Sequence, residues 1–491
     1  MRILHTSDWH LGRTFHGRVL DDAHAVFADH LVELARAEAV DAVVVSGDVY
    51  DRAIPPTDSV RLLDETLRRL SDITRVILTP GNHDSARRLG FASDLLREGL
   101  TIRARIADVD RPVIVPGPDG GDGLYVYALP YLDPDAARET LPPLLADRLG
   151  EEMADAARTA DPDADPDAAR TAPEGAGGHS EKAAGDPPGT TSDAATRRLP
   201  RSHEAVVSGA LRLVAADLAA RRAAAPARVP ALVMSHAFVV GGLPSEESER
   251  DIRVGGVDSV PSGVFASLGG SPSARECGGL DYVALGHLHR PQEIRSAGGA
   301  GRPNGPGKAG GTGGPEAGES DGPGESGPPQ RDSRPGPRLV YSGSPLALSF
   351  SEAPFPKSSV LVALGPDGVA SLERVPAPVP HRIETVTGTM DELLSPAWDH
   401  AAGAWVRAVV RGPMPLGATS RLRERFGQVL AIVREEDEEA PRERIVVTRA
   451  ADPLEVSAQF LAEVAEREPS PAERAVLARA YEAVLASHGG E

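Results

Sequence analysis

A short apolar segment that runs into polar residues opens the chain, where residues 2–12 read RILHTSDWHLG. Its apolar residues predict a strand over Arg2–Thr6, and Asp8 and His10 follow that strand directly. The same order returns in residues 42–51, AVVVSGDVYD, and in residues 75–84, RVILTPGNHD. Ligands bind at the carboxyl ends of strands in open α/β sheets. The pattern therefore predicts strands that deliver carboxylate, imidazole and amide groups to one rim of a sheet.

Helical patterns separate these strands. Apolar residues recur at helical spacing over Asp21–Ala39 and Thr57–Leu70. Further strands are predicted over Leu124–Leu129, Val229–Ser235, Tyr282–Gly286 and Leu339–Ser342. Several of these runs are apolar on both faces, which is typical of a sheet buried on both sides. Residues 1–355 therefore predict an α/β domain of the α/β/α sandwich type.

Two stretches of this domain cannot pack a core. Residues 155–200 are rich in Ala, Asp, Pro, Gly and Thr, and residues 298–337 contain 22 Gly or Pro among 40 positions. Such segments bury too little apolar surface to offset the entropy of chain ordering. We expect both to be disordered insertions.

The character of the chain changes after residue 356. Predicted strands lie over Ser359–Leu364, His381–Thr387, Ala404–Val410 and Gln428–Val433, with a helix over Thr419–Phe426. This indicates a smaller α+β domain over residues 356–450. Two helices are predicted in a tail over residues 451–491. They begin at Asp452 and Ser470, each followed by a proline and by a glutamate three residues on.

Composition and charge exclude several classes of protein. No apolar run approaches 18 residues, and residues 1–8 lack the apolar region of a secretory signal. The single cysteine, Cys277, cannot form an internal disulfide. We therefore expect a soluble, cytoplasmic protein. The 52 basic and 72 acidic residues give a net charge of −20, which argues against a free-standing electrostatic nucleic-acid binder but not against a local basic patch or a binding partner.

Five motifs carry the candidate chemistry, each in a loop after a predicted strand. The last two are Ser235-His236 and Gly286-His287-Leu288-His289. Together the five offer Asp, Asn and His side chains without a thiolate, a donor set suited to ions such as manganese, zinc or iron. The set exceeds the needs of one ion and fits two ions that share a carboxylate. Such a pair activates a water for in-line displacement at phosphorus. A lone His at a strand end is more often structural, so the inference rests on the ordered series.

The ordered series resembles the calcineurin-like metallophosphoesterase superfamily. Longer matches at residues 4–12, 47–52, 78–85 and 341–350 resemble the SbcD family of bacterial nuclease subunits. The resemblance covers the first domain apart from its insertions and, more loosely, the small domain. It implies a metallophosphoesterase α/β/α sandwich with a capping domain beside the active site.

The resemblance also implies roles for individual residues. It implies two divalent ions, preferably Mn²⁺, held by residues at the strand ends: Asp8, His10 and His289 for the first ion, Asn82, His236 and His287 for the second, and Asp48 as the bridge. A water activated by the metals would attack the phosphate in line. His83 would contact the phosphate and stabilise or protonate the departing oxygen. Asp84 would orient a ring.

By the same resemblance, the chain would be a manganese-dependent nuclease subunit that acts with an SbcC-like ATPase. The implied activities are 3'-5' exonuclease cleavage of double-stranded DNA ends and endonuclease cleavage of hairpins, in DNA repair and recombination. The implied assembly is a homodimer within a heterotetramer, in which the C-terminal helices hold the coiled-coil base of the ATPase.

Two other functions stay open from the residues. A phosphodiesterase acting on a small nucleotide would suit the acidic charge, although the second domain, the tail and residues 343–350 argue against it. A non-catalytic DNA-end scaffold is the other, and the complete ligand set argues against it. A structural role is favoured for two nearby residues: His5 as a packed core histidine, and Asp51, which could also approach the metals, as a residue that fixes its own loop.

Overall fold

The computed structural model describes residues 1–150, 198–245, 259–274, 276–294, 336–435, 457, 470–477 and 479. The insertions expected at residues 155–200 and 298–337 lie almost wholly outside these ranges, as does the helix expected to begin at Asp452. The helix expected at Ser470 is described over its first turns, where Ser470 and Glu473 exchange hydrogen bonds as a capping box. Within the described ranges, no helix is both long and apolar enough to cross a membrane.

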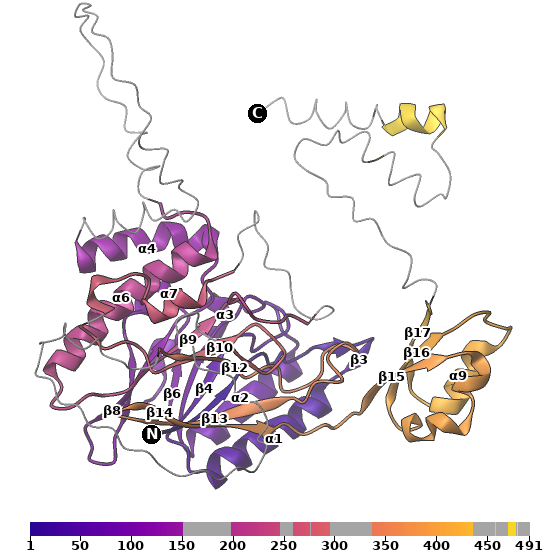
Figure 1. Ribbon diagram of the computed structural model, residues 1–491, viewed down its shortest axis with the longest axis horizontal. Coiled ribbons are helices and arrows are strands. Elements are labelled where there is room, and N and C mark those ends of the chain that lie inside the picture. The colour runs from indigo at the N-terminus through magenta and orange to yellow at the C-terminus, as the bar shows by residue number, and fades with distance from the viewer. Residues whose placement is uncertain are drawn as a thin grey trace, which may run out of the picture.

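Two six-stranded sheets form the centre of the first domain (Figure 1). The first sheet consists, in spatial order, of β14 (Gly368–Pro376), β13 (Ser358–Gly365), β1 (Arg2–Thr6), β4 (Ala42–Ser46), β5 (Arg75–Thr79) and β6 (Leu100–Ile102). The second consists of β11 (Gln292–Ile294), β12 (Arg338–Tyr341), β10 (Tyr282–Gly286), β9 (Ala231–His236), β8 (Asp122–Ala128) and β7 (Val113–Pro116). The central strands of both sheets are parallel. Antiparallel strands lie at both edges of the second sheet and at the β14 edge of the first, whereas β6 at the other edge is parallel to β5.

Helices cover the outer face of each sheet. Helices α1 (Asp21–Ala37) and α2 (Thr57–Ser71) pack on the first sheet, with Phe27 and Leu63 against Val43. Helices α4 (Pro134–Leu149) and α6 (His203–Ala224) pack on the second, with Leu141 and Leu211 in its core. The shorter elements are α3 (Ala86–Leu89), α7 (Ser262–Ala266) and 3₁₀ turns at Ser93–Leu95, Ile106–Asp108 and Pro272–Ala274.

The inner faces of the two sheets pack on each other. Ile3, Val44 and Ile77 of the first sheet share one buried cluster with Leu232 and Met234 of the second. The expected single sheet between helices is thus two sheets in a four-layer α/β/β/α arrangement. The reason is physical: apolar residues on both faces of a strand show that both faces are buried, and a second sheet buries a face as well as a helix does.

One predicted strand lies in a different sheet from the one expected. The strand expected over Ser359–Leu364 in the small domain is β13, and it pairs antiparallel with β1, with Val360 opposite His5. Val360 and Val362 join the core between the two sheets. Strand β14 pairs with β13, so the first sheet continues to Pro376.

The small domain follows this sheet. Its three parallel strands are β15 (Ile383–Gly388), β16 (Trp405–Val410) and β17 (Val429–Arg434). Helices α8 (Met390–Leu393) and α9 (Ala418–Phe426) and a 3₁₀ segment at Pro396–Ala401 connect them. Val406, Leu422 and Phe426 lie in its buried core. The strands and the helix expected in this segment are present, but parallel strands joined by helices form an α/β unit instead of the expected α+β one.

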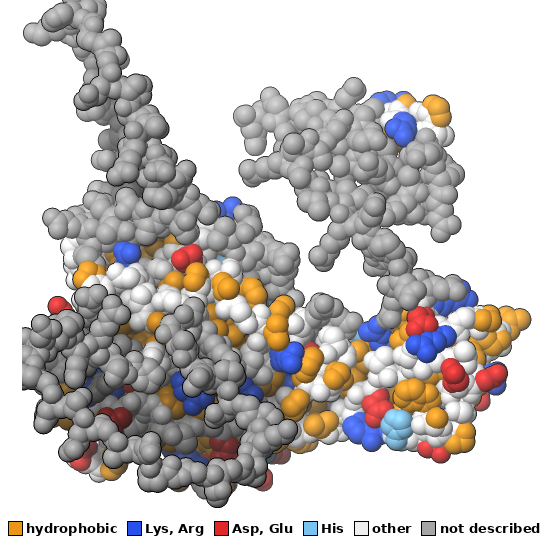
Figure 2. Space-filling model, in the orientation of Figure 1, with side chains coloured by type: hydrophobic (Ala, Val, Ile, Leu, Met, Phe, Trp, Pro, Cys, Tyr) orange, Lys and Arg blue, Asp and Glu red, His pale blue; other side chains and the backbone are white. Residues whose placement is uncertain are grey.

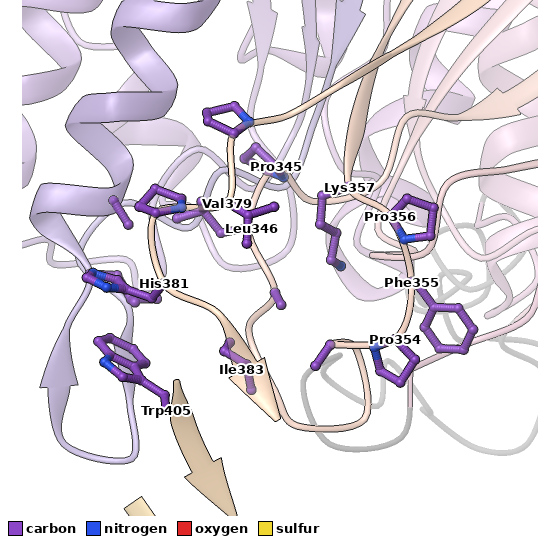
Figure 3. A pocket seen from close by; sticks show the side chains of 16 residues that line it. Pro345, Leu346, Pro354, Phe355, Pro356, Lys357, Val379, His381, Ile383 and Trp405 are labelled. Carbon is purple, nitrogen blue, oxygen red and sulfur yellow. The ribbon is translucent and has the colours of Figure 1, made fainter. Parts of the chain in front are cut away.

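The small domain packs against the first domain beside the hairpin formed by β2 (Thr14–Phe15) and β3 (Arg18–Val19). Phe15 and Phe350 share a cluster with Trp405. His381 stacks on Trp405, with ring centroids 4.2 Å apart, and its Nε2 lies 3.0 Å from Asp22 Oδ2. Figure 3 shows a pocket of about 320 Å³ at this junction, whose lining includes His381, Trp405 and Lys357.

Candidate metal centre

The carboxyl ends of five strands carry all of the predicted site residues. Strands β1 and β4 end just before Asp8, His10 and Asp48, and β5 ends just before Asn82, His83 and Asp84. Strand β9 ends at His236, and β10 precedes His287 and His289. The two sheets approach closely at this rim, since a Cβ on Gly286 would lie 1.9 Å from the Ser46 carbonyl oxygen.

Six of the predicted residues form three overlapping groups of metal-binding side chains. In each group the donor atoms lie within 4.8 Å of one another; the groups are Asp8, His10 and His289; His10, Asp48 and His83; and Asp8, Asp48 and His236. Every one of these side chains is buried. Asp48 Oδ2 lies 3.6 Å from His10 Nε2 and 3.4 Å from His236 Nε2, so this carboxylate stands between the groups.

The remaining two predicted ligands border these groups. Asn82 Oδ1 lies 2.8 Å from His236 Nε2. The centroid of the His287 ring lies 5.4 Å from that of the His236 ring, and the backbone N–H of His287 donates to Asp8 Oδ1 at 2.9 Å. Both residues therefore lie on the His236 side of the centre.

Hydrogen bonds fix the orientation of three imidazoles. His236 Nδ1 donates to the Ser46 carbonyl oxygen at 3.0 Å, and His83 Nδ1 donates to the Asp51 carbonyl oxygen at 2.8 Å. His289 Nδ1 donates to Glu352 Oε1 at 3.0 Å. Because Nδ1 of each ring donates a proton, Nε2 is the ring nitrogen left to bind a metal. The three Nε2 atoms face Asp48 or His10, as ligand atoms require.

The charges of the site are strongly coupled. Burial alone would raise the pKa of Asp48, but His236, His10 and His83 hold it well below its usual range. Burial would lower the pKa of His236, but Asp48 and Asp8 raise it to about 9. Burial lowers the pKa of His10 and of His287 well below the usual value. Buried carboxylates beside imidazoles whose Nε2 atoms face inward are a donor set that fits divalent cations.

The hydrogen bonds of the Asp84 carboxylate differ from those expected. It accepts the backbone N–H groups of Val49, Tyr50 and Gly81 at 2.9–3.0 Å instead of orienting a ring. Burial and the neighbouring Asp48 raise its pKa to about 7, against the effect of these three donors. Asp84 thus joins the loops that carry Asp48 and His83.

His5 and Asp51 make the contacts expected of structural residues, and Asp51 Oδ1 also lies 3.8 Å from His10 Nδ1. His5 is fully buried, and its Nδ1 lies 2.9 Å from the Tyr282 hydroxyl oxygen. Asp51 accepts a hydrogen bond from Arg13 at 3.0 Å, and its backbone N–H donates to the Leu11 carbonyl. Asp51 therefore ties its own loop to the loop after β1.

Sequence reasoning missed Glu352 and Lys357. Glu352 is fully buried against His289, and Lys357 forms an ion pair with Glu352. One signal was present in the sequence. Lys357 is one of only three lysines, and the other two, Lys182 and Lys308, fall in the predicted insertions.

The sequence of the chain is similar to those of known proteins. Residues 1–137 match the family model described as calcineurin-like phosphoesterase. The chain is 30% identical to the SbcD subunit of the nuclease SbcCD from Rhodobacter capsulatus over 436 residues, which cover 85% of this chain and 82% of that protein. It is 30% identical to the Bacillus subtilis SbcD subunit over 76% of this chain and 69% of that protein, and 25% identical to that of Escherichia coli K12 over 80% and 72%. The chain therefore belongs to the SbcD family of metallophosphoesterase nucleases.

Proposed function

We propose that the chain is the DNA-cleaving subunit of an SbcCD-type complex, a 3'-5' exonuclease on double-stranded ends and an endonuclease on hairpins. One observation carries the proposal: strands from two sheets bring buried Asp and His donors together, and Asp48 stands between them. Family membership supports DNA as the substrate, because the relatives are named nucleases.

Two divalent cations, preferably Mn²⁺, are proposed for this centre. Asp8, His10 and His289 would hold one ion, Asn82, His236 and His287 the other, and Asp48 would bind both. The mixed oxygen and nitrogen donors support this choice of metal. When bound, the ions would activate a water and neutralise charge on the phosphate. The protein's own contribution is to hold the His236 and His289 rings by hydrogen bonds at Nδ1, so that Nε2 of each ring faces the centre.

His83 is proposed as the group that stabilises or protonates the departing oxygen. The Asp51 carbonyl holds its Nδ1–H, which directs Nε2 toward the centre, 3.9 Å from Asp48 Oδ2. An imidazole held in this way can exchange a proton at Nε2 with a substrate oxygen. The proposed role of Asp84 is to hold the two loops that present Asp48 and His83.

An SbcC-like ATPase is the proposed partner, since the relatives are named as subunits of SbcCD nucleases. We assign its binding to the tail over residues 451–491. Figure 2 shows basic and acidic side chains intermingled over the described face of the small domain. This distribution and the net charge of −20 favour DNA binding by the complex over binding by this chain alone. The expected location is the cytoplasm.

A homodimer is also proposed, and exposed apolar residues beside the site support it. Phe91 is 82% exposed and Leu95 83% exposed, in the segment that follows the His83 loop. Leu96 next to them is 37% exposed. Contiguous exposed apolar side chains are typical of a protein interface, and twofold dimers are the commonest assemblies.

The test is cleavage of end-labelled linear and hairpin DNA with Mn²⁺, beside cyclic nucleotides and bis(p-nitrophenyl) phosphate, with and without the ATPase. We expect Asp48→Ala to abolish DNA cleavage. Asp58→Ala, which removes a carboxylate 76% exposed on α2, should leave cleavage unchanged.

Hydrolysis of the small esters with intact DNA, even with the ATPase present, would replace the nuclease by a small-nucleotide phosphodiesterase. If Asp48→Ala kept full repair function in cells, the chain would be a scaffold instead.

A further inference from the structure

A buried carboxylate lies behind the metal centre, in the loop between β12 and β13. Glu352 is fully buried, and its Oε1 accepts the His289 Nδ1–H at 3.0 Å. The two residues are 63 positions apart in the sequence. On the opposite side of its ring, His289 Nε2 lies 3.1 Å from His10 Nε2, within the group formed with Asp8. One edge of the ring thus meets Glu352 and the other meets the metal centre.

The second oxygen of Glu352 is surrounded by donors. Oε2 accepts from the Lys357 ammonium and from the Leu348 N–H at 3.2 Å, and it lies 3.3 Å from Ser344 Oγ, whose hydroxyl also has the Leu346 carbonyl oxygen at 2.9 Å. Lys357 also donates to the His289 carbonyl oxygen at 3.0 Å and to Ser344 Oγ at 2.9 Å. The side chain is therefore a carboxylate that accepts on both oxygens.

We propose that Glu352 is a positioning residue for the metal centre: it holds the proton of His289 on Nδ1 and so presents the Nε2 lone pair to a metal ion. The proposal rests on the proposed metal site. Partners of this kind set the tautomer and the ring orientation of a metal-binding histidine.

The donors around Glu352 make the proposal specific. In Glu352→Gln, the amide oxygen should face the Lys357 ammonium and the Leu348 N–H, because both groups can only donate and an amino group there would meet them without an acceptor. The amide nitrogen then faces His289 Nδ1 and donates to it. The ring proton moves to Nε2, and the lone pair that would bind the metal is lost. A substitution that barely changes shape should therefore disturb the metal centre.

A matched control exists at the other end of β10. Asp281 is also a buried carboxylate in an ion-pair network, with Arg228 at 2.9 Å and Arg222 at 3.2 Å. It precedes β10, whereas His287 and His289 follow that strand. Asp281→Asn therefore removes a comparable buried charge about 17 Å from the rim, at about 3.3 Å per strand residue.

The experiment measures equilibrium Mn²⁺ binding to the full chain from the electron paramagnetic resonance signal of free Mn²⁺. The proteins are wild type, Glu352→Gln, Asp281→Asn and the double variant Glu352→Gln with Lys357→Met. We expect Glu352→Gln to lower the affinity for one of the two Mn²⁺ ions at least tenfold. This lies within the range found when a hydrogen-bond partner of a metal ligand is mutated. Asp281→Asn should bind within twofold of wild type.

The double variant separates positioning from a structural role. It leaves no buried charge unpaired at this place, so we expect its thermal stability to recover above that of Glu352→Gln. Its Mn²⁺ affinity should stay low, because the amide still donates to His289. NMR of ¹⁵N-labelled histidine should show His289, assigned with a His289→Gln variant, protonated on Nδ1 in wild type and on Nε2 in Glu352→Gln.

Each contrary outcome identifies what fails. If Glu352→Gln bound Mn²⁺ as tightly as wild type, or if the double variant regained wild-type Mn²⁺ affinity, the proposed role of Glu352 would be overturned. The proposed metal site would stand. An unchanged His289 tautomer would overturn the role of Glu352 as well. If wild type itself bound no Mn²⁺, the proposed metal site would fall together with this inference.

Discussion

Asp8, His10, Asp48 and His287 all hold left-handed backbone conformations, with φ values of 55°, 47°, 48° and 103°. Such conformations cost non-glycine residues about 1–3 kcal/mol each and persist only where the surroundings impose them. Hydrogen bonds between the backbones of two loops impose them here. The Asp8 backbone N–H donates to the Gly47 carbonyl oxygen, and the His10 backbone N–H donates to the Asp48 carbonyl oxygen. The backbone turns sharply at each strand end, and the turn directs these side chains into the centre.

His83 can be tested apart from the ligands. It shares a group of close donor atoms with His10 and Asp48, so the geometry alone would also allow it to bind a metal. If it acts on the departing oxygen, His83→Gln should slow DNA cleavage by about 10²–10⁴-fold and leave Mn²⁺ affinity unchanged. Cleavage rates and Mn²⁺ titration of the same preparation measure both effects. Loss of one ion in His83→Gln would make it a ligand instead.

His5 predicts how stability depends on pH. Burial between the sheets lowers its pKa from 6.5 to about 3. Below pH 6.5 the unfolded chain binds a proton that the folded chain does not, so stability falls as the pH drops toward 3. Between pH 7.5 and 5.5, this single group should remove about 1.4 kcal/mol of unfolding free energy.

Urea unfolding at the two pH values checks this dependence. His5→Gln, which can still bond to Tyr282, should lose less stability on acidification than wild type. His24, whose pKa is lowered to about 4 by burial, keeps part of the slope in both proteins. Equal slopes would show that His5 does not titrate in this way.

At the scale of the elements, the ends of β4 and β10 meet so closely that only glycine fits. A Cβ on Gly286 would lie 1.9 Å from the Ser46 carbonyl oxygen and 2.8 Å from His236 Nδ1. Both atoms belong to the hydrogen bond that orients His236. The absence of a side chain at one strand end thus allows the two halves of the metal centre to approach.

Gly286→Ala should push the two sheets apart at the rim. We expect a loss of about 1–3 kcal/mol of stability, as in other overpacked cores, together with weaker Mn²⁺ binding. The control is Gly365→Ala at the end of β13, where an added Cβ would meet no atom within 4 Å. Chemical denaturation and Mn²⁺ titration of both variants provide the comparison. An alanine at 286 that changed neither quantity would refute the close-contact argument.

At the scale of the whole molecule, one loop links the small domain to the metal centre. Leu346, Leu348 and Phe350 pack in the cluster that includes Trp405 of the small domain. Two residues further on, Glu352 contacts His289. The position of the small domain and the orientation of a proposed ligand therefore depend on the same segment.

The proposed homodimer gives a prediction at this scale. The double variant Phe91→Glu with Leu95→Glu should shift the chain toward the monomer, because charges on an apolar interface must be desolvated. Leu416→Glu is the control, since Leu416 is fully exposed on the small domain. Light scattering after size-exclusion chromatography measures the mass of each variant. A wild-type chain that is already monomeric would contradict the dimer, and an unshifted double variant would place its interface elsewhere.

The local pattern of residues determined much of this protein. Strands β1, β4, β5 and β10 have the predicted bounds, because runs of largely apolar residues end there in turn-forming or polar residues. The convergence of the site residues followed from the same pattern, since the carboxyl ends of parallel strands lie on one edge. The predicted bounds of β15, β16 and α9 in the small domain also agree with the structure to within two positions.

Only the tertiary structure decided what covers each buried face. Periodicity shows that both faces of β1 are buried, but not that one faces helices and the other a second sheet. It could not pair β13 with β1, because these strands are more than 350 residues apart in the sequence. For the same reason Glu352 carried no local sign of its contact with His289. Long-range contacts depend on complementary packing and charge in three dimensions, and the residues next to each position in the chain do not encode them.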